Sequence, residues 1–407
     1  MKLVLLTANY PYGDGGDNYF IKNEIDDLSR KFDDISIVST CNAPLTKELP
    51  KNVVCSTVDI HAVSFWDAFF ALFATISGFF KTFFETKKFC KQEGALSILL
   101  EIFKYEVTYR KLRTVLAKEL SSCDVVYSYW MSARLYAALR VIKKRRLKCK
   151  VCTRAHGYDL YCFRNPLPYR TFIGNNVKEI IFISKDGLDY YKKLIYPSLK
   201  NKCHLYLSYL GLNKEAEPKP LIPHESLNIV SCSNVIQLKR LDIIVDALSE
   251  IKDIPIRWTH IGDGPMLDFI KKRAREKLGN LGNIHYRFLG RMANEEIFEF
   301  YRNGSFDLFI NCSDTEGLPV SVMEAFSFGI PAITRDVGGV SEINRLPKGL
   351  FLLEGCSDYR TFANVLVEFY NLNEMDKARY RAEAASIFER YFSRRNLSSF
   401  ADHISRL

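Results

Sequence analysis

Two glutamates eight residues apart, Glu316 and Glu324, flank the predicted start of a helix. Glu316-Gly317-Leu318-Pro319 follows an apolar strand and a turn rich in Ser, Asp and Thr, and a helical segment then runs through Glu324. The first N–H groups of a helix lie at its positive dipole end without helical partners, so they attract a phosphate or the electronegative edge of a sugar. With a helix start near Pro319, Glu324 can accept two hydroxyl hydrogen bonds, as a ribose offers, and Glu316 faces the sugar. The alternative is a capping glutamate followed by an exposed one.

Three loops elsewhere carry residues suited to ligands. The Gly15-Gly16 pair follows the opening strand, and glycines there let backbone N–H groups approach a phosphate, although they also suit an ordinary turn. His156 follows a predicted buried strand, so it can reach a crevice from the carboxyl edge of a sheet, although a lone histidine is more often structural. Gly262 and Gly264 also follow a strand, and their G-x-G pattern alone is weak.

The cysteines and acidic residues predict no metal site. The sequence has 11 cysteines, and its C-x-x-C of Cys149 and Cys152 has no second pair to complete a zinc site. We also find no D-x-D in a suitable loop. Free thiols in a reducing cytosol fit this pattern best.

Short β-rich runs alternate with helix-length segments along all 407 residues, which predicts parallel sheets covered by helices. The predicted strands are 2–7, 35–39, 125–129, 150–154, 180–184, 228–232, 256–261, 306–311, 330–334 and 350–353. Residues 213–224 contain three prolines and mixed charge, which indicates a linker. We therefore expect an α/β protein of two Rossmann-like domains, residues 1–215 and 225–389, with ligands bound in a crevice between the carboxyl ends of the two sheets.

The net charge of +10 is concentrated in the first half of the chain. Residues 81–150 hold 17 basic and 6 acidic groups, including KKRRLKCK at 143–150. Such a stretch suits an anionic partner: a membrane surface, a phosphorylated acceptor or a nucleic acid. A solvated helix face is the plain alternative.

Residues 65–84 form an aromatic segment, FWDAFFALFATISGFFKTFF. At helical spacing its large apolar residues share one broad face, and Asp67 and Lys81 fall on the other face with small residues. These charges and the narrow polar strip argue against a membrane-spanning helix. Two interpretations remain open: a core helix of the first domain, or an interfacial helix that dips into a bilayer while residues 81–150 contact anionic headgroups.

The run E-G-L-P-V-S-V-M-E at 316–324, with the G-x-P and D-V-G-G-x-x-E that follow, resembles the E-x7-E element of the retaining family 4 glycosyltransferases. The resemblance covers essentially the whole chain, is most specific over 228–342, and is poor over 60–120, where the acceptor would be recognised. It implies a GT-B fold, in which two Rossmann-like domains face across a cleft and the C-terminal helix, here 390–407, returns to the first domain.

The resemblance also implies roles for individual residues. Lys239 matches the lysine that neutralises the donor diphosphate. Asn234 stands where many members have an arginine that acts together with this lysine. Arg240, the residue next to Lys239, is a weaker candidate for this second positive charge. The remaining matches are Gly15 and Gly16 beside the diphosphate and acceptor, His156 against the donor sugar, Gly262 and Gly264 in the donor domain, and Gly290 with Arg291 beside the nucleotide base. We take Glu316, His156 and Lys239 as the catalytic residues.

The implied activity is transfer of a sugar from a UDP- or GDP-sugar, with retention and without a metal or other cofactor, to a glycan acceptor, expected to be lipid-linked. The implied process is synthesis of a surface polysaccharide or lipopolysaccharide by a cytoplasmic enzyme, peripheral at the inner face of the cell membrane. A nucleotide-sugar epimerase of the same fold is one alternative, which would need only the donor. A nucleic-acid-binding or scaffold protein is the other, and it would have no use for the two glutamates.

Overall fold

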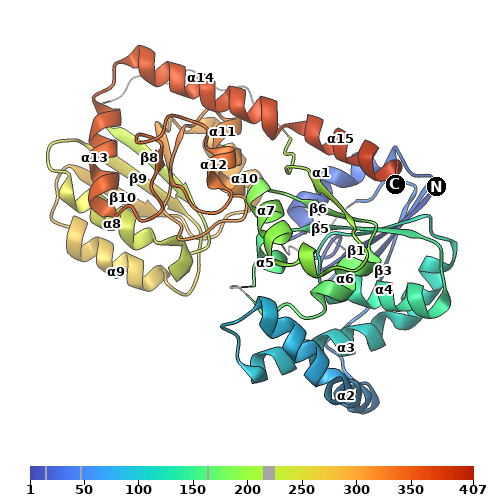
Figure 1. Ribbon diagram of the computed structural model, residues 1–407. Coiled ribbons are helices and arrows are strands. Elements are labelled where there is room, and N and C mark those ends of the chain that lie inside the picture. The colour runs from blue at the N-terminus through green and yellow to red at the C-terminus, as the bar shows by residue number, and fades with distance from the viewer. Residues whose placement is uncertain (14–15, 46–47, 163–164, 214–224) are drawn as a thin grey trace. The chain divides into compact units, whose positions relative to one another are not determined.

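The computed structural model describes residues 1–13, 16–45, 48–162, 165–213 and 225–407, so most of the predicted linker lies outside the described residues. The chain divides into two compact units (Figure 1). The first unit comprises Met1–Gly211 together with Arg395–Leu407, and the second comprises Leu212–Arg394. Both are α/β units, and each is described by itself.

The first unit is built on a seven-stranded parallel sheet in the order β3-β2-β1-β4-β5-β6-β7. The strands are β1 (Lys2–Thr7), β2 (Asp34–Ser39), β3 (Val53–Thr57), β4 (Val125–Ser128), β5 (Lys150–Ala155), β6 (Glu179–Phe182) and β7 (His204–Leu207). The strand order reverses between β1 and β4, which places the loops after these two strands at the switch point where ligands bind to open α/β sheets.

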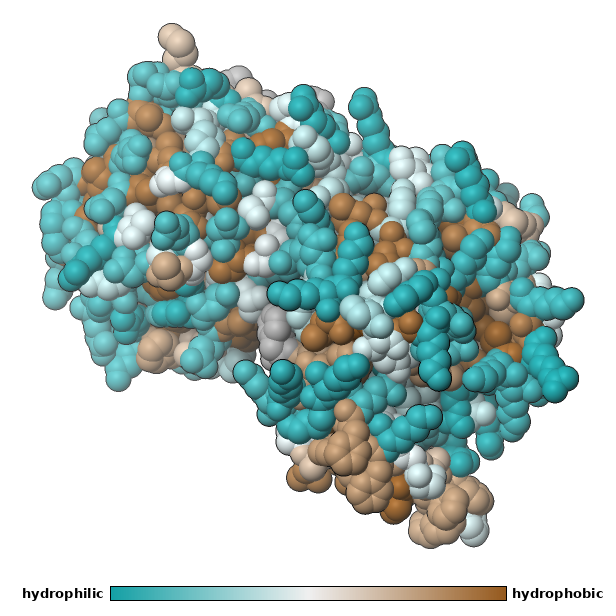
Figure 2. All heavy atoms as spheres, viewed as in Figure 1, coloured by the Kyte–Doolittle hydropathy of each residue, from teal (hydrophilic) through white to brown (hydrophobic). Residues whose placement is uncertain are grey.

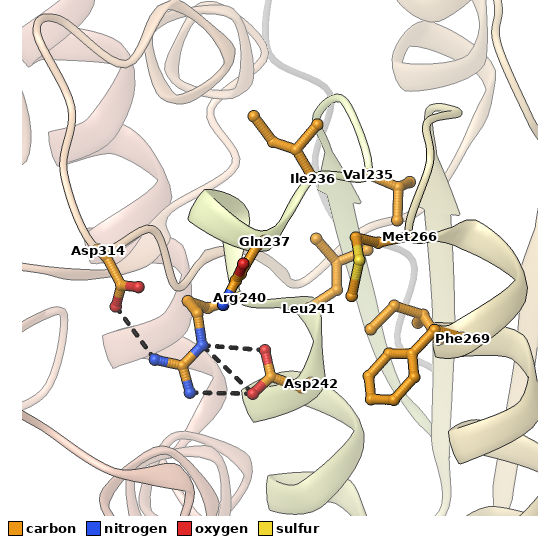
Figure 3. Close-up of a pocket in the computed structure, with 10 residues that line it drawn as sticks. Val235, Ile236, Gln237, Arg240, Leu241, Asp242, Met266, Phe269 and Asp314 are labelled. Atoms are coloured by element: carbon orange, nitrogen blue, oxygen red, sulfur yellow. Dashed lines mark hydrogen bonds and ion pairs between the residues drawn. The ribbon is translucent and has the colours of Figure 1, made fainter. Parts of the chain in front are cut away.

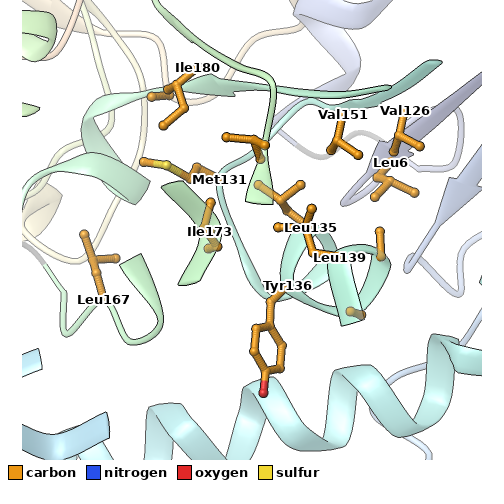
Figure 4. Close-up of a cluster of buried hydrophobic side chains, with 14 of the residues drawn as sticks. Leu6, Val126, Met131, Leu135, Tyr136, Leu139, Val151, Leu167, Ile173 and Ile180 are labelled. Carbon is orange, nitrogen blue, oxygen red and sulfur yellow. The ribbon is translucent and has the colours of Figure 1, made fainter. Parts of the chain in front are cut away.

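Helices cover both faces of this sheet and bury one apolar core on each side. The helices are α1 (Asn18–Ser29), α2 (Phe65–Phe89), α3 (Ala95–Glu119), α4 (Ala133–Arg145), α5 (Gly157–Leu160), α6 (Arg170–Asn176), α7 (Lys185–Leu194) and α15 (Arg394–Ser405). One core joins α3, α4, α6 and α7 to the sheet; Figure 4 shows Leu135, Leu139 and Ile173 within it. The other core lies under α1 and α15, so the end of the chain completes the first unit through Phe400 and Ile404.

Helix α2 does not belong to either core along its apolar side. It lies beside α3, away from the sheet (Figure 1). Most of its large aromatic residues are exposed, and small residues such as Ala71 and Thr75 are buried instead; Phe89, at the end of the helix, is the buried aromatic residue. The interpretation of 65–84 as a core helix is therefore wrong, because the side that packs on the protein is the small, weakly polar one.

The second unit has a six-stranded parallel sheet in the order β10-β9-β8-β11-β12-β13. The strands are β8 (Leu227–Cys232), β9 (Ile256–Ile261), β10 (Ile284–Phe288), β11 (Leu308–Asn311), β12 (Ala332–Arg335) and β13 (Leu352–Leu353). The helices are α8 (Leu241–Glu250), α9 (Leu267–Leu278), α10 (Asn294–Asn303), α11 (Val320–Ser327), α12 (Val340–Ile343), α13 (Tyr359–Tyr370) and α14 (Glu374–Tyr391). Here the order reverses between β8 and β11, so the loops after these two strands share the switch point.

Candidate active site

The switch point of the second unit brings together two residues that are 77 positions apart in the sequence. Lys239 ends a short 3-10 turn after β8, and its Nζ lies 2.6 Å from Oε1 of Glu316, in the loop after β11. Asn311, the last residue of β11, donates from Nδ2 to the same oxygen at 3.1 Å. An ammonium group and a carboxylate are thereby fixed at the carboxyl edge of the sheet.

Glu316 is buried and ionised. Burial alone would raise its pKa, but the charge of Lys239 and hydrogen bonds from Lys239 and Asn311 outweigh it, so the pKa of Glu316 lies below its ordinary value. Because the carboxylate keeps its charge, it holds Lys239 in place, and the side chain of Lys239 remains 21% exposed to a ligand.

The backbone of Glu316 is supported by Gly338. At Gly338, which has a φ of +56°, an added Cβ would lie 2.0 Å from the carbonyl oxygen of Glu316. No side chain fits at that distance, so a glycine is required for the loop after β12 to approach the Glu316 loop. This explains the D-V-G-G sequence by packing beside the site.

Helix α11 begins at Val320 with Pro319 at its N-cap, where the sequence places the helix start. Gly317 and Leu318, which precede the cap, are buried, and Glu324 is buried in the second turn. The positive end of α11 therefore lies in the loop that carries Glu316, and Glu324 follows it one turn into the helix.

Gly262 and Gly264 are accounted for by packing within the second unit. An added Cβ would lie 1.9 Å from the Ser233 carbonyl oxygen at Gly262 and 2.5 Å from the Val235 carbonyl oxygen at Gly264. Hydrogen bonds from Val235 N to Asp263 O and from Met266 N to Val235 O hold the two loops together. The two glycines shape the loop that leads to Lys239; a direct role in binding substrate stays a prediction.

Arg240 lies apart from the Lys239–Glu316 pair. Its guanidinium donates to Asp242 at 2.9 Å and to Asp314 at 3.2 Å, and it lines a cavity of about 500 Å³ with an apolar wall that includes Leu241 and Phe269 (Figure 3). Two carboxylates already bind the Arg240 guanidinium, which explains why Arg240 is only a weak candidate for the second cation. Asn234 and Arg291 are exposed at the ends of their loops.

In the first unit, His156 follows β5 and is buried, 7% exposed, with no hydrogen-bond partner in the described chain for either ring nitrogen. Its ring packs 4.9 Å from Tyr129 and 4.3 Å from Trp130, centroid to centroid, in the loop after β4. Its Nδ1 lies 3.9 Å from Asp159 Oδ2, too far for a hydrogen bond. A buried imidazole without a hydrogen bond is costly unless something else satisfies it, so this position is suited to a ligand.

The loop after β1 is held by Asp17. Its carboxylate accepts backbone N–H bonds from Ala8 at 2.7 Å and Asn9 at 3.0 Å, and Trp130 Nε1 lies 3.4 Å away. Asp17 therefore links the two loops of this switch point. Gly16 is exposed with open space where a Cβ would stand, and Gly15 lies outside the described residues.

Sequence reasoning missed several residues of the two switch points. No role was predicted for Asn311, Gly338, Asp17 or Trp130. Two of them belong to visible motifs: Asp17 is the second aspartate of D-G-G-D, and Gly338 is in the glycine pair of D-V-G-G. Neither motif says which distant backbone group the residue contacts.

Comparison with known proteins agrees with this geometry. Residues 213–385 match the family described as glycosyl transferases group 1. The O-antigen biosynthesis glycosyltransferase WclY of Escherichia coli is 25% identical over 260 residues, 59% of this chain and 68% of WclY. WbnH, another O-antigen biosynthesis glycosyltransferase of E. coli, is 35% identical over 105 residues, 26% of this chain and 27% of WbnH.

Solved structures are similar over the full chain. The lipopolysaccharide outer core galactosyltransferase WaaB superposes with a TM-score of 0.68 at 15% identity, covering 100% of both chains. Anabaena HepE, solved in complex with UDP and glucose, superposes with a TM-score of 0.66 at 16% identity, again covering 100% of both chains. The chain therefore has the GT-B fold. Its second unit carries a glycosyl transferases group 1 domain.

Proposed function

We propose that the chain is a retaining glycosyltransferase of family 4 that transfers a sugar from a UDP- or GDP-sugar to a glycan acceptor. The observation that supports this best is the Lys239–Glu316 pair at the β8/β11 switch point, beside the positive end of α11. A nucleoside diphosphate sugar carries a negatively charged diphosphate and several hydroxyl groups. The site offers a cation and a helix N-terminus for the diphosphate, and two carboxylates for the hydroxyl groups.

In this proposal the bond between the anomeric carbon and the diphosphate oxygen breaks while a bond to the acceptor hydroxyl oxygen forms. Negative charge builds on the departing diphosphate, and Lys239 with the first amides of α11 stabilises it. The departing phosphate oxygen takes the acceptor proton, so no separate base is needed. Glu324 binds the ribose hydroxyls, and Glu316 and His156 orient the donor sugar.

The amides of Gly15 and Gly16 and the exposed Arg291 are further binding groups in the proposal, for the diphosphate and the base. No metal or other cofactor takes part, since Lys239 and helix α11 supply the positive charge that a divalent ion would otherwise supply. Excess EDTA should leave the rate of transfer unchanged, and a rate restored only by added Mg²⁺ or Mn²⁺ would contradict this part.

The acceptor we propose is a lipid-linked glycan in surface polysaccharide or lipopolysaccharide synthesis, used at the cytoplasmic face of the membrane. The support is the similarity to O-antigen glycosyltransferases together with the basic excess of residues 81–150. Transfer of radiolabelled sugar into a butanol-extractable product would support a lipid-linked acceptor, whereas label confined to water-soluble product would contradict it.

Glu324→Ala and Glu316→Ala separate the two glutamate roles. Glu324→Ala should weaken binding of UDP or GDP, because it removes the acceptor for the ribose hydroxyls. Glu316→Ala should mainly lower turnover, by about a hundredfold or more, because Lys239 loses its positioning partner. Calorimetric binding and steady-state kinetics give the two quantities, with Glu299→Ala on the exposed side of α10 as control. Equal affinity and rate in both variants would remove the assignment.

A further inference from the structure

Helix α2 exposes an aromatic surface on the first unit. Its members are nine large apolar side chains: Phe65, Trp66, Phe69, Phe70, Leu72, Phe73, Ile76, Phe80 and Phe84. Phe65 is 74% exposed and Phe80 72%, and Leu96 at the start of α3 is 68% exposed beside them. Figure 2 shows a group of hydrophobic side chains that projects from the first unit where Figure 1 places α2.

The opposite side of α2 attaches the helix to the protein. Ala71, Thr75, Thr82 and Thr86 are buried, and the Thr75 and Thr86 hydroxyls donate to carbonyls one turn back, so neither requires an outside partner. A helix that serves only a folded core buries its large apolar side and exposes its small polar side. Helix α2 does the reverse from Phe65 to Phe84, and only its last residue, Phe89, enters the core. This pattern indicates that the aromatic side has a partner outside the chain.

The packing of α2 on α3 restricts how the aromatic surface can contact a membrane. At 25 residues, α2 is long and apolar enough to cross a membrane by length and composition. However, it lies along α3, which carries Glu101, Lys104 and Arg113 over the same length, and these charges do not enter hydrocarbon. The surface can therefore meet a bilayer only sideways, with the helix axis in the plane of the interface.

Basic residues border the aromatic surface. The Arg110 guanidinium lies 4.9 Å from the Phe70 ring centroid, and Lys111 Nζ donates to the Ala62 carbonyl at 2.8 Å, just before α2. Lys81 and Lys91 are exposed. Residues 64–118 hold nine Lys and Arg against five Asp and Glu, which gives a net charge of +4 around the surface.

The basic end of α4 lies near α6, which contacts α2. The backbone N–H of Thr171 on α6 donates to Glu85 of α2, and Lys143 lies 5.9 Å from the ring centroid of the neighbouring Phe172. Lys143 begins the run 143–150, which has six basic residues and no acidic one. The basic end of α4 is therefore connected to α2 through these contacts with α6.

We propose that the aromatic surface of α2 docks on an anionic lipid bilayer, with Trp66 and the Phe side chains at the level of the headgroups and the surrounding Lys and Arg on lipid phosphates. Aromatic rings favour this interfacial depth, and basic residues near it add electrostatic attraction. A second copy of the chain fits less well, because it would bring two positively charged rims together. The proposal does not depend on sugar transfer.

Co-sedimentation with vesicles tests the docking. Wild type should bind phosphatidylcholine vesicles that contain phosphatidylglycerol, and high salt should weaken the binding. The variant with Phe73→Ser, Phe80→Ser and Phe84→Ser should bind about tenfold less or worse while keeping the melting temperature, because all three rings are exposed. Phe269→Ser, at a 49% exposed position on α9, is the matched control and should bind as wild type.

Charge variants separate the two contributions to binding. Lys81→Glu with Lys91→Glu should weaken binding to anionic vesicles and leave the weaker binding to pure phosphatidylcholine unchanged. Equal binding of wild type to both vesicle compositions at low salt would overturn the role of anionic lipid.

The fluorescence emission of Trp66 reports whether the aromatic surface enters the lipid. Trp66 is 64% exposed, whereas Trp130 is half-buried in the loop after β4 and Trp258 is 1% exposed, so a blue shift on adding vesicles should come mainly from Trp66. Trp66→Phe should abolish the shift, and brominated lipids should quench the wild-type emission. Quenching that persists in Trp66→Phe, or vesicle binding that the triple Phe variant retains, would overturn the proposal. A dimer that the triple variant dissociates, without vesicle binding by wild type, would assign the surface to a second copy.

Discussion

The ion pair of Lys239 and Glu316 shows how a single contact can set the chemistry of a site. A flexible lysine side chain loses rotamer freedom when it binds a phosphate, and a buried carboxylate that already holds it lowers that loss. The same contact keeps Glu316 ionised, because its pKa lies below the ordinary value. The contact therefore keeps the carboxylate charged and holds the lysine side chain in one position, as the proposed diphosphate site requires.

A substitution at Gly338 tests the Lys239–Glu316 pair, because it displaces the backbone of Glu316. Gly338→Ala should lower turnover strongly, because the new Cβ would stand 2.0 Å from the Glu316 carbonyl oxygen and would displace it. Gly349→Ala is the matched control, since Gly349 also has a positive φ, +86°, but open space around its Cβ position. Both variants should lose about 1 kcal/mol of stability from backbone strain. Equal activity of the two variants would show that the contact with Glu316 does not matter.

His260 on β9 predicts a pH dependence of stability. Burial lowers the pKa of His260 from 6.5 to about 4, because the ring is 0% exposed and its charged form is poorly solvated. As the pH falls from 7 to 5, the unfolded chain takes up a proton at this residue and the folded chain does not, so stability decreases by about 2 kcal/mol from this residue.

The measurement is urea unfolding at pH 7 and pH 5, followed by Trp258 fluorescence in a background with Trp66→Phe and Trp130→Phe. His260→Gln should lose less stability than its parent over this pH range. The Glu316 contribution, whose pKa is also lowered, is lost only at more acidic pH. An identical pH dependence in parent and variant would contradict the burial of a neutral His260.

At the scale of elements, a buried ion pair joins three segments of the first unit. Arg154 on β5 bonds to Glu24 on α1, and its guanidinium stacks 3.9 Å from the Phe400 ring centroid on α15. Both charged side chains are almost fully buried, at 1% and 2% exposure. A helix near the start of the chain and one near its end are thus tied to the same strand.

Arg154→Met should destabilise the first unit by about 3–5 kcal/mol, because it leaves the Glu24 carboxylate buried without its cation. The double variant Glu24→Leu with Arg154→Met should recover most of that loss, since it removes both charges. Thermal unfolding followed by circular dichroism gives the comparison. A double variant less stable than Arg154→Met alone would contradict this account of the pair.

The elements themselves show what the sequence could predict. The central strands β1, β4, β5, β8 and β11 were predicted because they are mostly buried and their apolar residues do not alternate strictly with polar ones. Three of the four edge strands, β3, β7 and β10, were missed, because they are partly exposed and carry polar residues such as Arg287 on β10. The fourth, β13, is buried and was predicted within 350–353. Edge strands resemble loops in composition, so sequence alone distinguishes them poorly.

The site and α2 show where sequence reasoning stops. The helix start near Pro319 follows from local pattern, and the structure agrees with it. The local pattern left open whether Glu324 is exposed, and the structure shows it buried. The direct contact of Lys239 with Glu316 depends on the order of β8 and β11 in the sheet, which the sequence does not state. The sequence predicted that α2 has one side of large apolar residues and one side with small residues. Which of these sides packs on the protein depends on α3, so the sequence could not predict it.

At the scale of the whole molecule, charge is divided unevenly along the chain. Residues 1–220 carry 34 Lys and Arg against 22 Asp and Glu, and residues 221–407 carry 23 against 25. The half that contains Lys239 and Glu316 thus has no excess of positive charge, so an anionic donor must be held by local groups. The basic excess of the other half is available for a membrane surface.

The central claim is that the Lys239–Glu316 site cleaves a nucleotide sugar, and nucleotide release from a panel of UDP- and GDP-sugars without acceptor tests it most directly. The account predicts slow release of UDP or GDP from one donor by wild type, lost in Glu316→Ala, with Glu299→Ala unchanged. Release that Glu316→Ala retains in full, or a wild-type chain that neither cleaves a donor nor binds any nucleotide, would contradict it.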